Sequence, residues 1–126
     1  MEPSKAQALL AKLREDIRRR ESATSPDRPV LPSGFPALDA LLPGGGFPAG
    51  RVVELTGTPA SGKTTLALLA IAQATRSGRL AAFVDPRDEL YPPAARALGA
   101  DLSRLLVVRP RQAELAVRAA ALLARS

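Results

Sequence analysis

Eight consecutive residues combine glycine, lysine and threonine at a spacing that can bind phosphate. They fit the pattern G-x-x-x-x-G-K-[ST] at every fixed position, and they are Gly57, Thr58, Pro59, Ala60, Ser61, Gly62, Lys63 and Thr64. The glycines let the backbone turn tightly and approach a phosphate, while the loop N–H groups can form an anion-binding nest. Lys63 can then reach the β- and γ-phosphates of a nucleotide, and the Thr64 hydroxyl can ligate Mg²⁺.

The residues on both sides of this loop predict the elements that would position it. Residues 51–56 are apolar and β-branched between two glycines, which predicts a strand. Residues 65–74 predict a helix that ends near Ser77 and Gly78. The N-terminus of such a helix directs a partial positive charge at the phosphates. The alternative is a Gly- and Pro-rich turn that only happens to contain a lysine, and the two flanking elements argue against it.

The rest of the chain predicts an α/β fold. We expect a short helix at 38–42, strands at 80–85 and 105–108, and helices at 92–98 and 111–125. The strand at 80–85 is apolar throughout, as buried parallel strands are. Strands that alternate with helices predict right-handed crossovers and a parallel sheet covered on both faces.

The N-terminal residues predict a separate amphipathic helix over residues 3–21. Ser4 and Gln7 have capping-box spacing, and Leu9, Leu13 and Ile17 fall on one face. The helix could pack on its own domain or dock as an arm on a neighbouring subunit. We therefore divide the chain into a helix at 1–22, a linker at 23–32 and a nucleotide-binding core at 33–126.

Composition excludes several classes of function. The chain has 126 residues and no Cys or His, so the usual zinc sites, thiol chemistry and Ser-His catalysis are not expected. The net charge of +6 favours polyanion partners without saying which one. Aromatic residues make up only 3%, so base stacking of the kind used by single-strand binders is not supported. No apolar run can span a bilayer, and we expect a cytoplasmic protein without a membrane partner.

From about residue 30 to its end the chain resembles the RecA recombinase family. The likeness rests on Ser33-Gly34, Leu38-Asp39, residues 44–54, the loop from Gly57 to Thr65, Phe83-Val84-Asp85 and residues 95–106. It implies a three-layer parallel sheet of the RecA-like P-loop ATPase type, with ATP and Mg²⁺ as cofactors. It also implies assembly on single-stranded DNA in recombination and repair, and docking of the N-terminal helix on the adjacent protomer of a filament.

The resemblance also assigns roles to individual residues. Residues 57–65, Thr65 included, would bind the nucleotide, Thr64 would hold the metal, and Lys63 would stabilise the charge of the transferring phosphoryl group. The family carries a glutamate that activates water two positions after the strand-ending Asp85, and here that position is Arg87. An arginine cannot act as a base at neutral pH. Asp85 is the best remaining carboxylate, either as a catalytic group or, more simply, as a cap.

The end of the chain is a further departure from the family pattern. The strand that carries the second metal-site aspartate in the family would follow the helix at 111–125. We therefore expect a sheet truncated before that strand, with an open edge.

Three functions remain open at this point. The first is a RecA-like, DNA-dependent ATPase. The second is an ATP-binding protein with weak or no hydrolysis, similar to the ImuA-type accessory proteins that work with error-prone polymerases. These share the lead-in at residues 31–34 and 41–46. The third is a small-molecule kinase, which would place a lid and acceptor-binding residues after the third strand, where we find neither.

Overall fold

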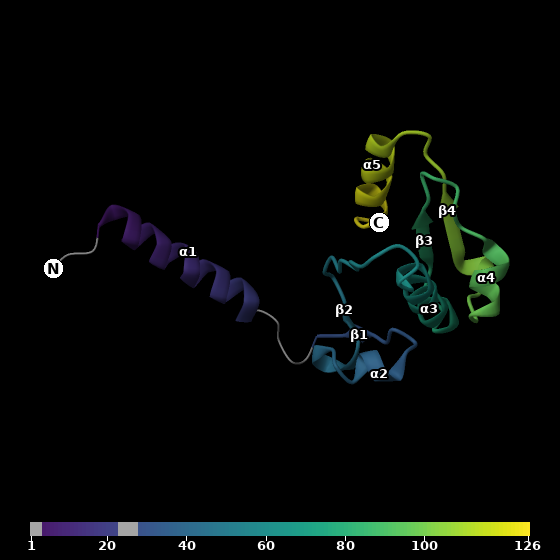
Figure 1. The fold of residues 1–126 in the computed structure, drawn as a ribbon, viewed down its shortest axis with the longest axis horizontal. Coiled ribbons are helices and arrows are strands. Elements are labelled where there is room, and N and C mark those ends of the chain that lie inside the picture. Colours follow the sequence, from purple (N-terminus) through teal and green to yellow (C-terminus); the bar gives the residue numbers. More distant parts are fainter. Residues whose placement is uncertain (1–3, 23–27) are drawn as a thin grey trace.

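The computed structural model describes residues 4–22 and 28–126, and they form an α/β fold (Figure 1). Along the chain the elements are α1 (Lys5–Ser22), β1 (Val30–Leu31), α2 (Pro36–Asp39), the 3₁₀ turn η1 (Pro43–Gly45), β2 (Phe47–Pro48), α3 (Lys63–Arg76), β3 (Ala81–Val84), α4 (Pro92–Ala97), the 3₁₀ turn η2 (Leu102–Arg104), β4 (Leu105–Val108) and α5 (Ala113–Leu123).

Strands β3 and β4 form a small parallel sheet, with α4 and η2 in the connection between them (Figure 1). The register pairs Ala81 with Leu105 and Val84 with Val108. The Asp85 amide continues the ladder by donating to the Val108 carbonyl at 2.8 Å. The α/β fold with a parallel sheet that the sequence predicts is therefore confirmed.

The hydrophobic core lies between one face of this sheet and the helices α3 and α4. Phe83 and Val107 are register partners, and both pack against the buried cluster. Ala72 on α3 and Ala95 on α4 are fully buried at 0% exposure. Such small side chains let the two helices approach closely. The core as a whole is made mostly from aliphatic groups. The buried cluster consists of Leu68, Ala72, Leu90, Ala95 and Ala100.

The opposite face of the sheet is covered less completely. Successive residues of a strand point to opposite faces, so Ala82 and its partner Leu106 face away from the core. Both line a cavity of about 670 Å³ together with Leu123 of α5. Leu106 remains 54% exposed, so α5 contacts this face without sealing it.

A short antiparallel pair precedes the phosphate-binding loop. Val30 pairs with Pro48 and Leu31 with Phe47. The linker that the sequence predicts at 23–32 falls partly on residues 23–27, which lie outside the described residues. Two of its remaining residues belong instead to β1, because the chain folds back on itself and pairs with the residues that lead into the loop.

The strand expected at 51–56 does not form, and this expectation was wrong. These residues have no ladder partner in the described structure, and Val52 is 99% exposed. Arg51, Val53 and Leu55 alternate in lining a cavity of about 630 Å³ that separates this segment from β3. The pattern of alternate residues is that of a strand, but a strand also needs a hydrogen-bonded neighbour, and β3 lies across the cavity.

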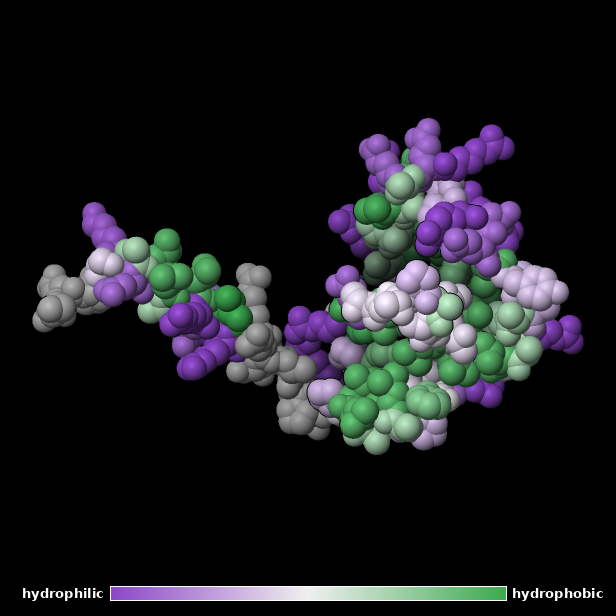
Figure 2. Space-filling model, viewed as in Figure 1, coloured by the Kyte–Doolittle hydropathy of each residue, from purple (hydrophilic) through white to green (hydrophobic). Residues whose placement is uncertain are grey.

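Helix α1 begins with the capping box that the sequence predicts. The Ser4 amide donates to Gln7 Oε1 at 3.0 Å, and the Gln7 amide donates to Ser4 Oγ at 3.2 Å. Apolar and charged side chains gather on different sides of the helix (Figure 2). Leu9 and Leu13 are more than half exposed, so the apolar side of α1 has no cover in this structure. Among the helices of residues 4–22 and 28–126, none has the length and apolar character that a bilayer crossing requires.

Candidate functional site

Residues 60–65 enclose a hollow at the start of α3. Its volume is about 240 Å³, and its wall includes Lys63, Thr64 and Thr65 from the first turn of the helix. Gly62 is the N-cap residue, with φ of +90°, a left-handed conformation that glycine adopts without strain. The first amides of α3 lack helical partners, so they are free to bind an anion in the hollow.

The loop is closely packed at its start. A Cβ on Gly57 would lie 2.7 Å from Ser61 Oγ, so the Ser61 hydroxyl would have to move away to make room for it. Ala60 has φ of +59°, which costs a residue with a Cβ about 1–2 kcal/mol. The loop therefore holds a curled conformation that its residues would not adopt alone.

The Lys63 side chain lies back across this loop. Its Nζ donates to the carbonyl oxygens of Gly57 at 2.7 Å and Thr58 at 2.8 Å, with Ser61 Oγ at 3.4 Å. The structure thus brings together the residues that the sequence singles out for phosphate binding. The ammonium group is hydrogen-bonded to these carbonyl oxygens. It would have to break these bonds in order to contact a phosphate.

Asp85 lies at the end of β3 and is almost fully buried, at 4% exposure. Its Oδ1 accepts from the Glu89 amide at 3.0 Å, and its Oδ2 accepts from the Leu90 amide at 2.9 Å. These two hydrogen bonds, with a smaller contribution from the Arg109 guanidinium, hold the pKa of Asp85 below its ordinary value of 3.8. Both oxygens are therefore used to fold the segment that follows β3.

Arg109, which follows β4, completes this anchor, and sequence reasoning missed it. Its Nε lies 2.6 Å from Asp88 Oδ1 and 3.7 Å from Asp85 Oδ2, and its Nη2 donates to the Leu90 carbonyl at 3.5 Å. The sequence did contain a sign that Asp85 and Arg109 could meet, because each follows directly after a strand. If the two strands are parallel and in register, residues at these positions meet at one edge of the sheet.

Arg87 lies on the same segment but pairs with Glu89. Its Nε lies 3.5 Å from Glu89 Oε1, and both side chains are more than 60% exposed. An exposed pair of this kind contributes little to stability. The position that the resemblance assigns to a catalytic glutamate is thus held by a cation paired with a nearby carboxylate.

Comparison with known proteins identifies the family to which this fold and loop belong. The model of the RecA N-terminal domain matches residues 14–126. The chain belongs to the RecA family. It is 53% identical over 97 residues to the Protein RecA of Salinispora tropica, covering 77% of this chain and 28% of that protein. It is 46% identical over 110 residues to the Protein RecA of Francisella philomiragia, covering 87% of this chain and 31% of that protein. The chain therefore spans less than a third of the length of these RecA proteins.

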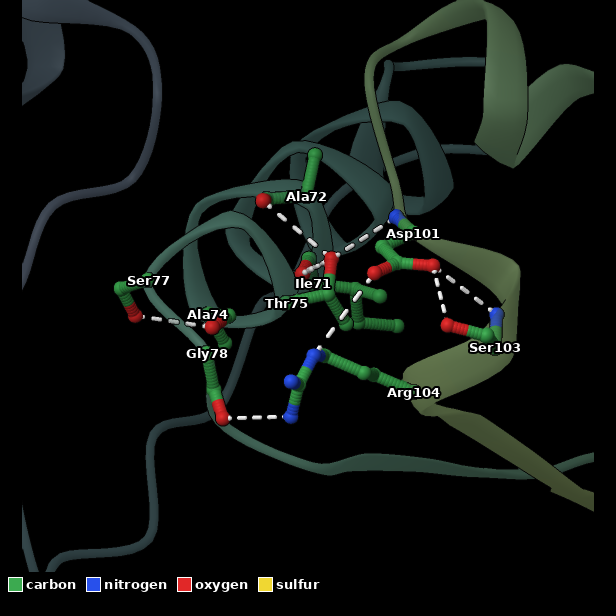
Figure 3. A network of polar contacts seen from close by, with 9 residues as sticks. All are labelled: Ile71, Ala72, Ala74, Thr75, Ser77, Gly78, Asp101, Ser103 and Arg104. Carbon is green, nitrogen blue, oxygen red and sulfur yellow. Dashed lines mark hydrogen bonds and ion pairs between the residues drawn. The ribbon is translucent and has the colours of Figure 1, made fainter.

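A polar network at the far end of α3 fixes the helix that carries the RecA-type loop (Figure 3). Thr75, 1% exposed, donates through Oγ1 to the Ile71 carbonyl at 2.9 Å and accepts from the Asp101 amide at 3.0 Å. Asp101 in turn caps η2 by accepting from the Ser103 amide and hydroxyl, and these bonds lower its pKa. Arg104 ties η2 to the turn that follows α3 by donating to the Gly78 carbonyl at 2.8 Å.

The residues around the hollow fit a magnesium–nucleotide complex better than a protein-held metal. Residues 4–22 and 28–126 contain no group of three or more acidic, His or Cys side chains that could hold an ion. Mg²⁺ at nucleotide sites keeps several waters and is bound largely through substrate phosphates. Three hydroxyl-bearing residues, Ser61, Thr64 and Thr65, line the hollow, and a hydroxyl ligand from among them is compatible with this mode of binding.

Proposed function

We propose that this chain binds ATP with Mg²⁺ at residues 57–65. The observation that supports the proposal most directly is the hollow at the N-terminus of α3, with Lys63 held against its rim. Backbone amides would cradle the phosphates, Thr64 would ligate Mg²⁺, and the positive end of α3 would add to the attraction. Membership of the RecA family supports the same assignment.

Lys63 would act on the terminal phosphates. Its ammonium group already makes charge-assisted hydrogen bonds to Gly57 and Thr58. On binding, it would exchange these carbonyl oxygens for phosphate oxygens. There it would stabilise the charge that spreads over the transferring group.

At the level of the whole protein, we propose a role in DNA repair and recombination through ATP-dependent assembly on single-stranded DNA. This follows the family, and the net charge of +6 suits a polyanion partner. The uncovered apolar side of α1, which includes Leu9 and Leu13, would dock on a second copy of the chain in an oligomer or filament. We place this function in the cytoplasm.

One observation favours a second candidate, an ATP-binding protein with little or no hydrolysis. Arg87 replaces the family's water-activating glutamate, and both oxygens of Asp85 already accept backbone amides. Neither group is available as a base. The chain would then act as an ImuA-type accessory protein of error-prone DNA repair synthesis, with polymerase components as partners.

We further propose that the two-stranded sheet is part of a larger, three-layer RecA-like sheet. The alternate side chains of residues 51–55 face β3 across a cavity of about 630 Å³. Further strands in that space would give residues 51–56 the neighbours that they lack. They would also cover the open edge of β3.

Calorimetric titration with Mg-ATP tests the binding site. We expect measurable binding by the unaltered chain and none by Lys63→Ala, while Lys12→Ala, an exposed lysine on α1, binds normally. Absence of binding by the unaltered, folded chain would refute the proposal. The two functional candidates separate on ATP turnover with single-stranded DNA: turnover above background that Lys63→Ala abolishes eliminates the non-hydrolysing one.

A further inference from the structure

A second cavity adjoins the phosphate-binding hollow. It has a volume of about 410 Å³ and lies between the start of α3 and the segment that runs from residue 89 to residue 98. Thr64 and Thr65 line both the hollow and this cavity, and Glu89 contributes to the wall of the cavity from the segment after β3. The first turn of α3 and the segment after β3 therefore face a common space beside the loop.

Arg87 lies in a turn at the carboxyl end of β3. The Asp88 amide donates to the Asp85 carbonyl at 3.5 Å, which closes a turn with Arg87 near its centre. The Asp85 carboxylate holds the chain beyond this turn by accepting from the Glu89 amide at 3.0 Å. Ligands of open α/β sheets bind outside the carboxyl ends of the strands. The turn thus fixes the backbone of Arg87 at the edge of the sheet where such a ligand binds.

The Arg87 side chain is held only weakly. Its Nε lies 3.5 Å from Glu89 Oε1, and Glu89 is its single ion-pair partner among residues 4–22 and 28–126. The side chain of Arg87 is 79% exposed and that of Glu89 is 64% exposed, so water screens the pair and it contributes little free energy. The guanidinium group can leave this carboxylate at low cost.

Arg109, the other guanidinium beside this turn, is not free in the same way. Its Nε lies 2.6 Å from Asp88 Oδ1, and its Nη2 donates to the Leu90 carbonyl at 3.5 Å. It also faces the buried carboxylate of Asp85 at 3.7 Å. Moving Arg109 toward a ligand would undo the anchor after β3, whereas moving Arg87 would not.

A bound triphosphate would leave its outermost phosphate for side chains to hold. In a loop of this pattern the backbone amides cradle the inner phosphates, and the lysine reaches the outer ones. Arginine presents a planar fork of N–H donors that matches a phosphate group, and such charge-assisted contacts are stronger than an exposed ion pair. The outermost phosphate is thus a better partner for Arg87 than the Glu89 carboxylate.

We propose that Arg87 is a phosphate-binding residue that makes the chain prefer a nucleoside triphosphate to a diphosphate. The inference rests on the proposed function of the loop 57–65. When the triphosphate binds, the Arg87 guanidinium exchanges the Glu89 carboxylate for the outermost phosphate. A diphosphate lacks that group and leaves the ion pair intact. The residue that cannot serve as a base would thus hold the phosphate that a base would help to remove.

The first test is calorimetric titration of Mg-ATP and Mg-ADP into the intact chain and into Arg87→Ala. We expect Arg87→Ala to weaken Mg-ATP binding by about tenfold, because one charge-assisted contact is lost, and to change Mg-ADP binding by less than about twofold. Arg118→Ala, which removes an exposed arginine of α5, is the matched control and should change neither affinity. Urea midpoints should be the same for all three proteins, since both arginines are exposed.

Glu89→Gln provides the second measurement, because it removes the carboxylate that competes for Arg87. It should strengthen Mg-ATP binding by about threefold and leave Mg-ADP binding unchanged. The gain should disappear when Arg87→Ala is also present. An equal gain with and without Arg87 would show that the Glu89 carboxylate repels the phosphates directly, and the proposed exchange would be wrong.

The titrations also separate this inference from the proposed function of the loop. If both nucleotides bind and Arg87→Ala leaves the ratio of their affinities unchanged, the role of Arg87 is refuted while the loop 57–65 stands. If neither nucleotide binds to the unaltered, folded chain, the proposed function fails, and the role of Arg87 fails with it.

Discussion

Thr75→Val tests how the helix that carries the phosphate-binding loop is held to the rest of the core. Thr75 is 1% exposed, and its hydroxyl links α3 to the residues before η2 by accepting from the Asp101 amide. Valine has nearly the same shape but cannot accept a hydrogen bond. The substitution therefore removes this link without creating a cavity.

The expected loss follows from the partners of the hydroxyl. The Asp101 amide would lose its acceptor at a partly buried position, which costs about 1–2 kcal/mol. The Ile71 carbonyl, to which the hydroxyl donates, belongs to helix α3 and loses only an additional bond. With a urea m-value of about 1–3 kcal/mol/M, the unfolding midpoint should fall by roughly 0.3–2 M.

Urea unfolding followed by circular dichroism measures the change in stability, and hydrogen exchange locates it. Exchange of the Asp101 amide should become faster in Thr75→Val. Ser77→Ala serves as the control, because its hydroxyl donates to the Ala74 carbonyl at an exposed position and should contribute less than about 0.5 kcal/mol. An unchanged midpoint together with unchanged exchange at Asp101 would refute the reasoning.

Three further predictions concern the loop, the anchor after β3 and the strand pair that precedes the loop. Gly62→Ala and Gly50→Ala each place a Cβ at a positive φ in open space, so each should lower the free energy of unfolding by about 1 kcal/mol. Only Gly62→Ala should also weaken Mg-ATP binding in calorimetry. Folding lowers the pKa of Asp85, so the stability that this carboxylate contributes to the fold is present above pH 3.8 and is lost as pH falls through the lower folded pKa. Between pH 6 and pH 3 the urea midpoint should therefore fall more steeply for the native chain than for Asp85→Asn. Gly46→Ala would place a Cβ 2.5 Å from the Leu31 carbonyl oxygen, and thermal unfolding should show a loss of about 1–3 kcal/mol as β1 and β2 separate.

The turn at residues 57–62 and the helix that follows it could be predicted from sequence because their structure is local. A glycine at position 62 allows the left-handed turn that starts α3, and the lysine that follows is carried on the first turn of that helix. The capping box of Ser4 and Gln7 was predictable for the same reason, since both partners lie within one helical turn. Short-range geometry of this kind needs no knowledge of the rest of the fold.

The anchor after β3 was only partly predictable. The sequence placed Asp85 at the end of a strand but could not say whether its carboxylate faces a ligand or its own backbone. The structure shows that both oxygens accept amides of the following turn and that Arg109 supports them from the neighbouring strand. The outcome depends on which strand lies beside β3.

The sequence by itself determined the glycine-rich turn before α3, the alternation of helices and strands, and the family, because all three follow from patterns along the chain. Tertiary structure alone decided that residues 51–56 have no partner strand and that both oxygens of Asp85 accept backbone amides of the turn after β3. It also decided that a second cavity adjoins the loop. The physical reason is that a strand, a buried carboxylate and a pocket each depend on neighbours that are distant in sequence. Alternating apolar residues indicate that a segment can form a strand, but only a hydrogen-bonded partner makes it one.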